Sequence, residues 1–108
     1  MQSWLCMGGA ILFEVAGTVS MKLSEGFSRL IPSVLIFIFY GLAFILLTLA
    51  LKKIDVGVAY AVWSGVGTAL VAIIGFLFLK ESMPLIKILF IALIIAGVTG
   101  LYLTTTAP

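Results

Sequence analysis

Four long apolar runs dominate this chain and restrict what it can fold into. They span about residues 4–21, 33–51, 56–79 and 85–103. A helix rises about 1.5 Å per residue, so roughly 20 apolar residues cross the hydrocarbon core of a bilayer, which is about 30 Å thick. We therefore expect an all-α membrane protein with four transmembrane helices.

The polar segments between these runs are too short to hold a further domain. Charged residues make up 9% of the 108 residues and apolar residues 64%, whereas soluble domains carry roughly 25% charged residues. The first run lacks the basic segment of a secretory signal, so we interpret it as retained. The sequence predicts a single transmembrane domain over residues 1–108, in the cell membrane, with both termini on one side.

Several functions are excluded by what the chain lacks. It has no histidine and a single cysteine, Cys6, so we expect no metal site and no intrachain disulfide. Its lysines and arginines are not clustered as a nucleic-acid surface requires. The phosphate-binding motif GxxxxGK[ST] is absent. We expect neither an enzyme nor a cofactor, and any active transport must draw on an ion gradient or a partner.

Glu14 is the one charged residue inside the first run. An acidic side chain costs several kcal/mol when it faces lipid, so such residues usually face a cavity or a partner. Burial also disfavours the charged form of a carboxyl group. Glu14 is therefore expected to hold a proton at rest and to yield it to an incoming cation. The alternative is a protonated glutamate that makes one interhelical hydrogen bond.

Small residues share a helical face with Glu14. Ala10, Gly17 and Thr18 lie three or four positions away from it, which places them on the same side of a helix. They leave room beside the carboxylate for a ligand, although close helix packing also favours small residues, and both interpretations stay open. Tyr40 in the second run is a candidate to offer its ring or its phenol to the carboxylate.

The segment AYAVWSGVG, residues 59–67, carries a second candidate set. Tyr60 and Trp63 share a helical face, and Trp63 lies about seven residues inside its run, deeper than the aromatic residues of a membrane interface. Aromatic rings at this depth bind cations through their quadrupoles, whereas the alternative is an aromatic core contact. Gly65 and Gly67 predict a bend, which is typical of moving segments in transporters.

Small residues at four-residue spacing in the fourth run allow two helices to approach closely. They are Ala92, Ala96 and Gly100, with Gly97 beside them. We predict that they pack a dimer, and the alternative is that they face lipid. Four helices barely surround a passage, whereas a dimer supplies twice that number and two copies of Glu14.

The distribution of positive charge gives only a weak signal for the orientation of the chain in the membrane. Lys and Arg in the connectors set the orientation of a membrane protein. The first and third connectors carry Lys22, Arg29, Lys80 and Lys87, and the second carries Lys52 and Lys53. This weak bias leans toward termini outside and lets the chain insert both ways. Two opposed copies would form an antiparallel dimer, which is an inverted repeat made from two chains.

Three segments carry a resemblance to a known family: GGAILFEVAGTVSMKLSEGFSRLIPS, GVAYAVWSGVG and IIAGV. They resemble the small multidrug resistance family, and its quaternary-ammonium branch in particular, and the resemblance covers nearly the whole chain. It implies an antiparallel homodimer that exports lipophilic cations in exchange for protons. The family's essential glutamate falls on Glu14. Its pocket-lining residues fall on Tyr40, Tyr60, Trp63, Ala10, Gly17 and Thr18.

The chain departs from the family pattern at two positions. Ala43 replaces a pocket serine, and Phe90 stands where the fourth-helix packing motif usually opens with glycine. The guanidinium-exporting branch typically carries a tryptophan about a turn after the glutamate, which is absent from this chain, so the multidrug branch is favoured. Three alternatives stay open: export of guanidinium or a polyamine, a role as one subunit of a heterodimeric pair, and a non-transporting membrane subunit.

Overall fold

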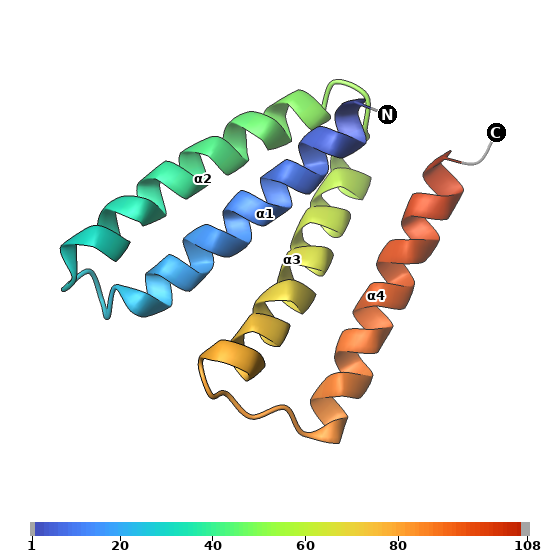
Figure 1. Ribbon diagram of the computed structural model, residues 1–108. Coiled ribbons are helices and arrows are strands. Elements are labelled where there is room, and N and C mark those ends of the chain that lie inside the picture. The colour runs from blue at the N-terminus through green and yellow to red at the C-terminus, as the bar shows by residue number, and fades with distance from the viewer. Residues whose placement is uncertain (1, 107–108) are drawn as a thin grey trace. The chain divides into compact units, whose positions relative to one another are not determined.

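The computed structural model describes residues 2–106 and consists of helices joined by short connectors (Figure 1). The helices are α1 (Gln2–Leu23), α2 (Leu30–Ala50), α3 (Val56–Phe78) and α4 (Leu85–Thr106). Each of them is long and apolar enough to cross a membrane. The predicted all-α fold with four transmembrane helices is confirmed.

The helix ends differ from the predicted runs by a few residues. α2 begins at Leu30 rather than at residue 33. Pro32 consequently lies in the first turn of α2, where a backbone N–H would have no carbonyl partner and its absence costs nothing. At the other end of the chain, α4 continues into the threonine-rich tail. Thr104 donates its hydroxyl proton there to the Gly100 carbonyl one turn back.

The chain divides between Asp55 and Val56 into two compact helix pairs, α1 with α2 and α3 with α4. Within the first pair, α1 and α2 run antiparallel (Figure 1). The buried residues of α2 are Ile36, Ala43 and Ala50, spaced seven apart, so they form one stripe along the helix. Two alanines in this stripe allow a close approach of helices. The single domain over residues 1–108 stays a prediction.

The α1–α2 connector is a tight turn held by Ser24. Ser24 is buried, and its Oγ accepts a hydrogen bond from the Phe27 amide at 3.2 Å. Glu25, Gly26 and Phe27 adopt positive φ angles of 46°, 71° and 69°, a conformation that glycine adopts at least cost. An exposed ion pair of 2.6 Å joins Glu25 to Arg29. The residues SEGF, 24–27, therefore encode this turn.

The second pair is closely packed at Gly65. A Cβ at Gly65 would lie 2.5 Å from Cγ2 of Val98 and 3.3 Å from Cγ2 of Ile94, so only glycine lets these side chains of α4 reach the backbone of α3. Beyond the end of α3, the Glu81 amide donates a hydrogen bond of 3.0 Å to the Gly75 carbonyl. The Glu81 carboxylate also folds back over the α-carbon of Gly75.

Candidate functional site

Glu14 lies near the middle of α1 and is partly buried. Its Oε1 accepts a hydrogen bond from Thr18 Oγ1, one turn further along, at 3.4 Å, which is long for such a bond. Its Oε2 is buried and has no hydrogen-bond partner among residues 2–106. Ala10, one turn before Glu14, is fully buried and adds no polar group. Because buried polar atoms are normally paired, this half-satisfied carboxyl group is suited to a ligand.

Thr18 links Glu14 to Tyr40 on α2. Thr18 Oγ1 and the Tyr40 hydroxyl oxygen are 2.6 Å apart. Either hydroxyl can donate in this contact. When Thr18 directs its single hydroxyl proton to Glu14, Tyr40 donates to Thr18. The three groups form a chain of hydrogen bonds directed toward the carboxylate. The structure therefore brings Tyr40 to Glu14 through Thr18 rather than by direct contact.

Gly17 makes room for the ring of Tyr40. A Cβ at position 17 would lie 2.5 Å from Cδ2 and 2.6 Å from Cε2 of Tyr40. Further aromatic rings surround this contact: Tyr40 packs at a tilt on Phe44 with ring centroids 5.8 Å apart, and Phe13 stacks on Phe39 at 6.1 Å. The sequence pattern does not single out these phenylalanines. The four-residue spacing of Tyr40 and Phe44 is the signal that could have found one of them.

Tyr60 and Trp63 form an aromatic pair on α3. Their ring centroids are 5.6 Å apart and the ring planes are inclined at 51°. Tyr60 is 62% exposed, and Trp63 is partly buried. The hydroxyl of Ser64 donates its proton to the Tyr60 carbonyl at 2.7 Å, so that proton is already used in a hydrogen bond to the helix backbone. What this segment can offer a ligand is the π surface of its rings, which attracts cations.

The structure groups the candidate binding residues within each helix pair. The first pair brings together Ala10, Glu14, Gly17, Thr18 and Tyr40, and the second brings together Tyr60 and Trp63. α3 is one continuous helix through Gly65 and Gly67, so a bend at these glycines stays a prediction.

The small residues of α4 are exposed in the chain. They are Ala92, Ala96, Gly97 and Gly100. A Cβ at Gly97 or Gly100 would meet nothing within 4 Å among the described residues. This surface is therefore open to lipid or to a second copy of the chain, and its role in dimer packing stays a prediction.

Comparison with known proteins identifies the family. A family model described as Small Multidrug Resistance protein matches residues 2–94. The chain belongs to this family. An uncharacterized membrane protein of Bacillus subtilis, YvaE, is 58% identical over 94% of this chain and 85% of its own length. The quaternary ammonium compound-resistance protein QacF of Klebsiella aerogenes is 45% identical over 95% of this chain and 94% of its own. A guanidinium exporter of Yersinia pestis is 41% identical over 95% of this chain and 99% of its own.

Membership of the small multidrug resistance family fixes the general class of the protein. It is a multi-pass transporter of the cell membrane and not an enzyme. The resemblance drawn from the three sequence segments is thereby confirmed. The α1–α2 cluster contains Glu14, which is the one acidic residue within α1 and α2, and this makes it the leading candidate for the transport site.

Proposed function

We propose that this protein is a proton-coupled antiporter that exports lipophilic quaternary ammonium cations. In this proposal the proton and the cation compete for Glu14. The observation that carries it is the state of that carboxyl group, which has one oxygen paired with Thr18 and the other buried without a partner among the described residues. The similarity to QacF, a quaternary ammonium compound-resistance protein, supports the substrate class.

The proton step follows from the hydrogen-bond chain. A proton taken up from outside neutralises Glu14 and stabilises it in the apolar surroundings of α1. When the proton leaves, the charged carboxylate accepts a stronger hydrogen bond from Thr18, which in turn is supported by Tyr40. Thr18 and Tyr40 therefore act as positioning residues that hold Oε1 while Oε2 exchanges its partner.

The cation step follows from the chemistry of the substrate. A quaternary ammonium group has no N–H to donate, so charge attraction and aromatic ring faces must hold it. Glu14 supplies the charge, and Trp63 and Tyr60 supply ring faces, with Tyr40 as a third aromatic residue. Guanidinium favours a carboxylate that accepts two parallel hydrogen bonds.

Alternating access requires that the opening of the binding site changes sides. In this proposal two chains in opposite orientations form an antiparallel homodimer, as the weak charge bias allows, and both copies of Glu14 serve one substrate passage. Bending of α3 near Gly65 and Gly67 moves Trp63 relative to the rest of its helix. The substrate leaves on one side, and protons from that side reload the two carboxyl groups.

Proton release on substrate binding tests this proposal directly. Detergent-solubilised protein in weak buffer receives a lipophilic quaternary cation, and the pH of the solution is followed. We expect proton release from the wild type and none from Glu14→Gln. The matched control is Glu25→Gln, which removes an exposed connector carboxylate and should release as many protons as the wild type. Binding should also weaken as the pH falls, because a protonated Glu14 carries no charge to attract the cation.

Other results of the proton-release experiment would change the proposed substrate or mechanism. Release with guanidinium but not with the quaternary cation would place the chain with the guanidinium exporters, one of which is a relative at 41% identity. Release from Glu14→Gln equal to the wild type would remove Glu14 from the coupling step. No release with either cation would reject a homodimeric antiporter for these substrates and point to a polyamine substrate, a second chain or a non-transporting role.

A further inference from the structure

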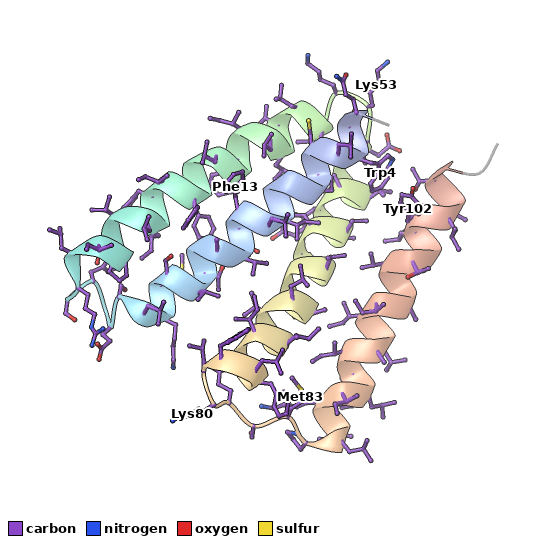
Figure 2. All side chains as sticks on the ribbon, viewed as in Figure 1. Trp4, Phe13, Lys53, Lys80, Met83 and Tyr102 are labelled. Atoms are coloured by element: carbon purple, nitrogen blue, oxygen red, sulfur yellow. The ribbon has the colours of Figure 1, made fainter. Side chains whose placement is uncertain are left out.

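A cavity of about 700 Å³ lies at one end of the α1–α2 pair, where α1 begins and α2 ends. Its lining includes Gln2, Trp4, Leu49, Lys52, Lys53 and Ile54. Figure 2 shows Trp4 and Lys53 at this same end of the pair. The volume is within the range of about 300–1,000 Å³ that is typical of sites for small molecules. No step of the proposed transport mechanism uses this cavity.

The cavity lies at the level of a membrane surface. α1 has 22 residues and α2 has 21, so each is about 32–33 Å long, close to the thickness of the hydrocarbon core. The first residue of α1 and the last residue of α2 must therefore lie near the boundary between hydrocarbon and headgroups. Trp4, which is partly buried in the cavity wall, is of a residue type enriched at that boundary.

The lining of the cavity carries positive charge from two adjacent lysines. The main chain of this turn is held by hydrogen bonds from the amide of Lys52 to the Leu49 carbonyl and from that of Lys53 to the Ala50 carbonyl, at 3.3 and 3.2 Å. Both lysine side chains are exposed, and none of the described residues that line the cavity is acidic. The next charged residue along the chain is Asp55, which is exposed and lies outside the lining.

Apolar side chains form another part of the lining, beside the polar residues Gln2 and Ser3. Ile54 is only 4% exposed, and it contributes to the wall together with Trp4 and Leu49. A cavity whose lining includes two lysines and several apolar side chains suits a molecule that joins an anion to a hydrocarbon. A free inorganic anion would make no favourable contact with the apolar side chains.

We propose that this cavity binds the headgroup of an anionic phospholipid. Lys52 and Lys53 hold the phosphate, Gln2 offers its amide to the glycerol or headgroup hydroxyls, and Trp4, Leu49 and Ile54 contact the first carbons of the acyl chains. Basic residues near a membrane surface attract anionic lipids by about 1 kcal/mol each, or roughly fivefold in affinity. Because of the two lysines, the cavity should bind an anionic lipid with higher affinity than a zwitterionic one.

The protein contains its own reporter for this test. Cys6 is the single cysteine of the chain, and it lines the cavity. The experiment measures the rate at which a water-soluble maleimide labels Cys6 in the full-length protein in neutral detergent micelles. Short-chain phosphatidylglycerol, short-chain phosphatidylcholine or inorganic phosphate is added in increasing amounts. We expect phosphatidylglycerol to slow labelling at concentrations at least about fivefold lower than phosphatidylcholine, and inorganic phosphate to leave the rate unchanged.

Charge variants identify the groups responsible. Lys52→Gln/Lys53→Gln should lose the preference for phosphatidylglycerol, and Lys52→Arg/Lys53→Arg should keep it, which shows that any loss is not a failure to fold. The matched control is Lys22→Gln/Lys87→Gln, which removes the same charge from residues outside the cavity and should behave as the wild type. Equal protection by the two lipids, or a preference that survives in Lys52→Gln/Lys53→Gln, would overturn the proposal.

A variant in which a side chain fills the cavity distinguishes lipid binding inside the cavity from general attraction of lipid to the lysines. Leu49 is 41% exposed, so Leu49→Trp can occupy the cavity while both lysines stay in place. We expect this variant to lose the lipid-dependent part of the protection of Cys6. If phosphatidylglycerol still protects Cys6 as in the wild type, the lipid does not enter the cavity. Protection by inorganic phosphate alone would replace the lipid by a free phosphate ion and also reject the proposal.

Discussion

At the scale of the single residue, Gly17 controls the position of Tyr40. A Cβ at position 17 would overlap two ring carbons of Tyr40 and lie 3.4 Å from Cβ of Phe39. In Gly17→Ala the ring must therefore shift, and overpacking of this kind costs about 1–3 kcal/mol. Because the 2.6 Å contact between Tyr40 and Thr18 depends on the ring position, we expect the affinity for a quaternary cation to fall about tenfold or more, as measured by calorimetry.

The control for Gly17→Ala is Gly8→Ala on the same helix. A Cβ at Gly8 meets nothing within 4 Å among the described residues, so this substitution changes helix propensity without disturbing a neighbour. Its cation affinity should equal that of the wild type. Equal affinity in Gly17→Ala as well would mean that Tyr40 does not position the binding site.

The residue scale also shows where sequence reasoning stops. Glu14, Gly17 and Thr18 can be assigned to one face from helical spacing alone, because that spacing is fixed within a single helix. The contact between Thr18 and Tyr40 depends on the register of α1 against α2, which interhelical packing determines. The sequence pattern within either helix does not determine how the two helices are aligned against each other. The hydrogen-bond chain to the carboxylate was therefore beyond prediction, although each of its members was a candidate.

At the scale of the helix, the apolar runs predict well that each helix exists and that it is a transmembrane helix. They predict its first and last residues less well. α2 starts within the polar connector, because Leu30 and Ile31 extend its apolar surface and Pro32 is tolerated in a first turn. The left-handed backbone at Glu25 and Phe27 is not typical of these residue types, so only the neighbouring glycine signals the turn.

At Gly65, the role of the residue in packing α3 against α4 can be tested separately from its role in bending α3. Gly65→Ala would place a Cβ against Val98, whose branched side chain is stiff. We expect a loss of about 1–3 kcal/mol in the stability of the α3–α4 pair, seen as earlier thermal unfolding in detergent. Val98→Ala in the same chain removes the overlapping Cγ2 and should recover most of that loss.

Transport by the doubly substituted protein then tests the bend in α3. If Gly65 is needed for bending, Gly65→Ala/Val98→Ala should unfold near the wild-type temperature and still export poorly, while Val98→Ala alone exports normally. Recovery of transport together with stability would show that Gly65 serves packing only. A Gly65→Ala chain as stable as the wild type would contradict the predicted steric clash.

At the scale of the whole molecule, a chain of this size provides one intramembrane carboxylate and one headgroup cavity. Two chains inserted in opposite orientations would provide two carboxylates for a shared passage, and they would place the Lys52–Lys53 cavity at both membrane surfaces. Anionic lipid in each leaflet could then hold one protomer at its proper depth. The weak bias of lysine and arginine is consistent with such a pair, because neither orientation is strongly preferred.

The small-residue surface of α4 offers the clearest test of the dimer. A Cβ added at Gly97 would meet nothing within 4 Å among the described residues, so Gly97→Leu should leave the protomer folded while it prevents a close approach of two α4 helices. We expect the dissociation constant of the dimer, measured by energy transfer between labelled chains, to rise at least about tenfold, since interfaces of this kind depend on close van der Waals packing. In the proposed homodimer the substrate passage needs both chains, so export should fall in parallel.

Gly41→Leu is the matched control for this prediction. Gly41 lies within α2 and is exposed, and a Cβ added there would also meet nothing within 4 Å among residues 2–106. It therefore receives the same added side chain on a different surface, and its dimer and its export should both be unchanged. Loss of the dimer in both variants would point to a general effect of the added leucine. A dimer that survives in Gly97→Leu would place the glycine and alanine stripe of α4 against lipid and move the interface to another helix.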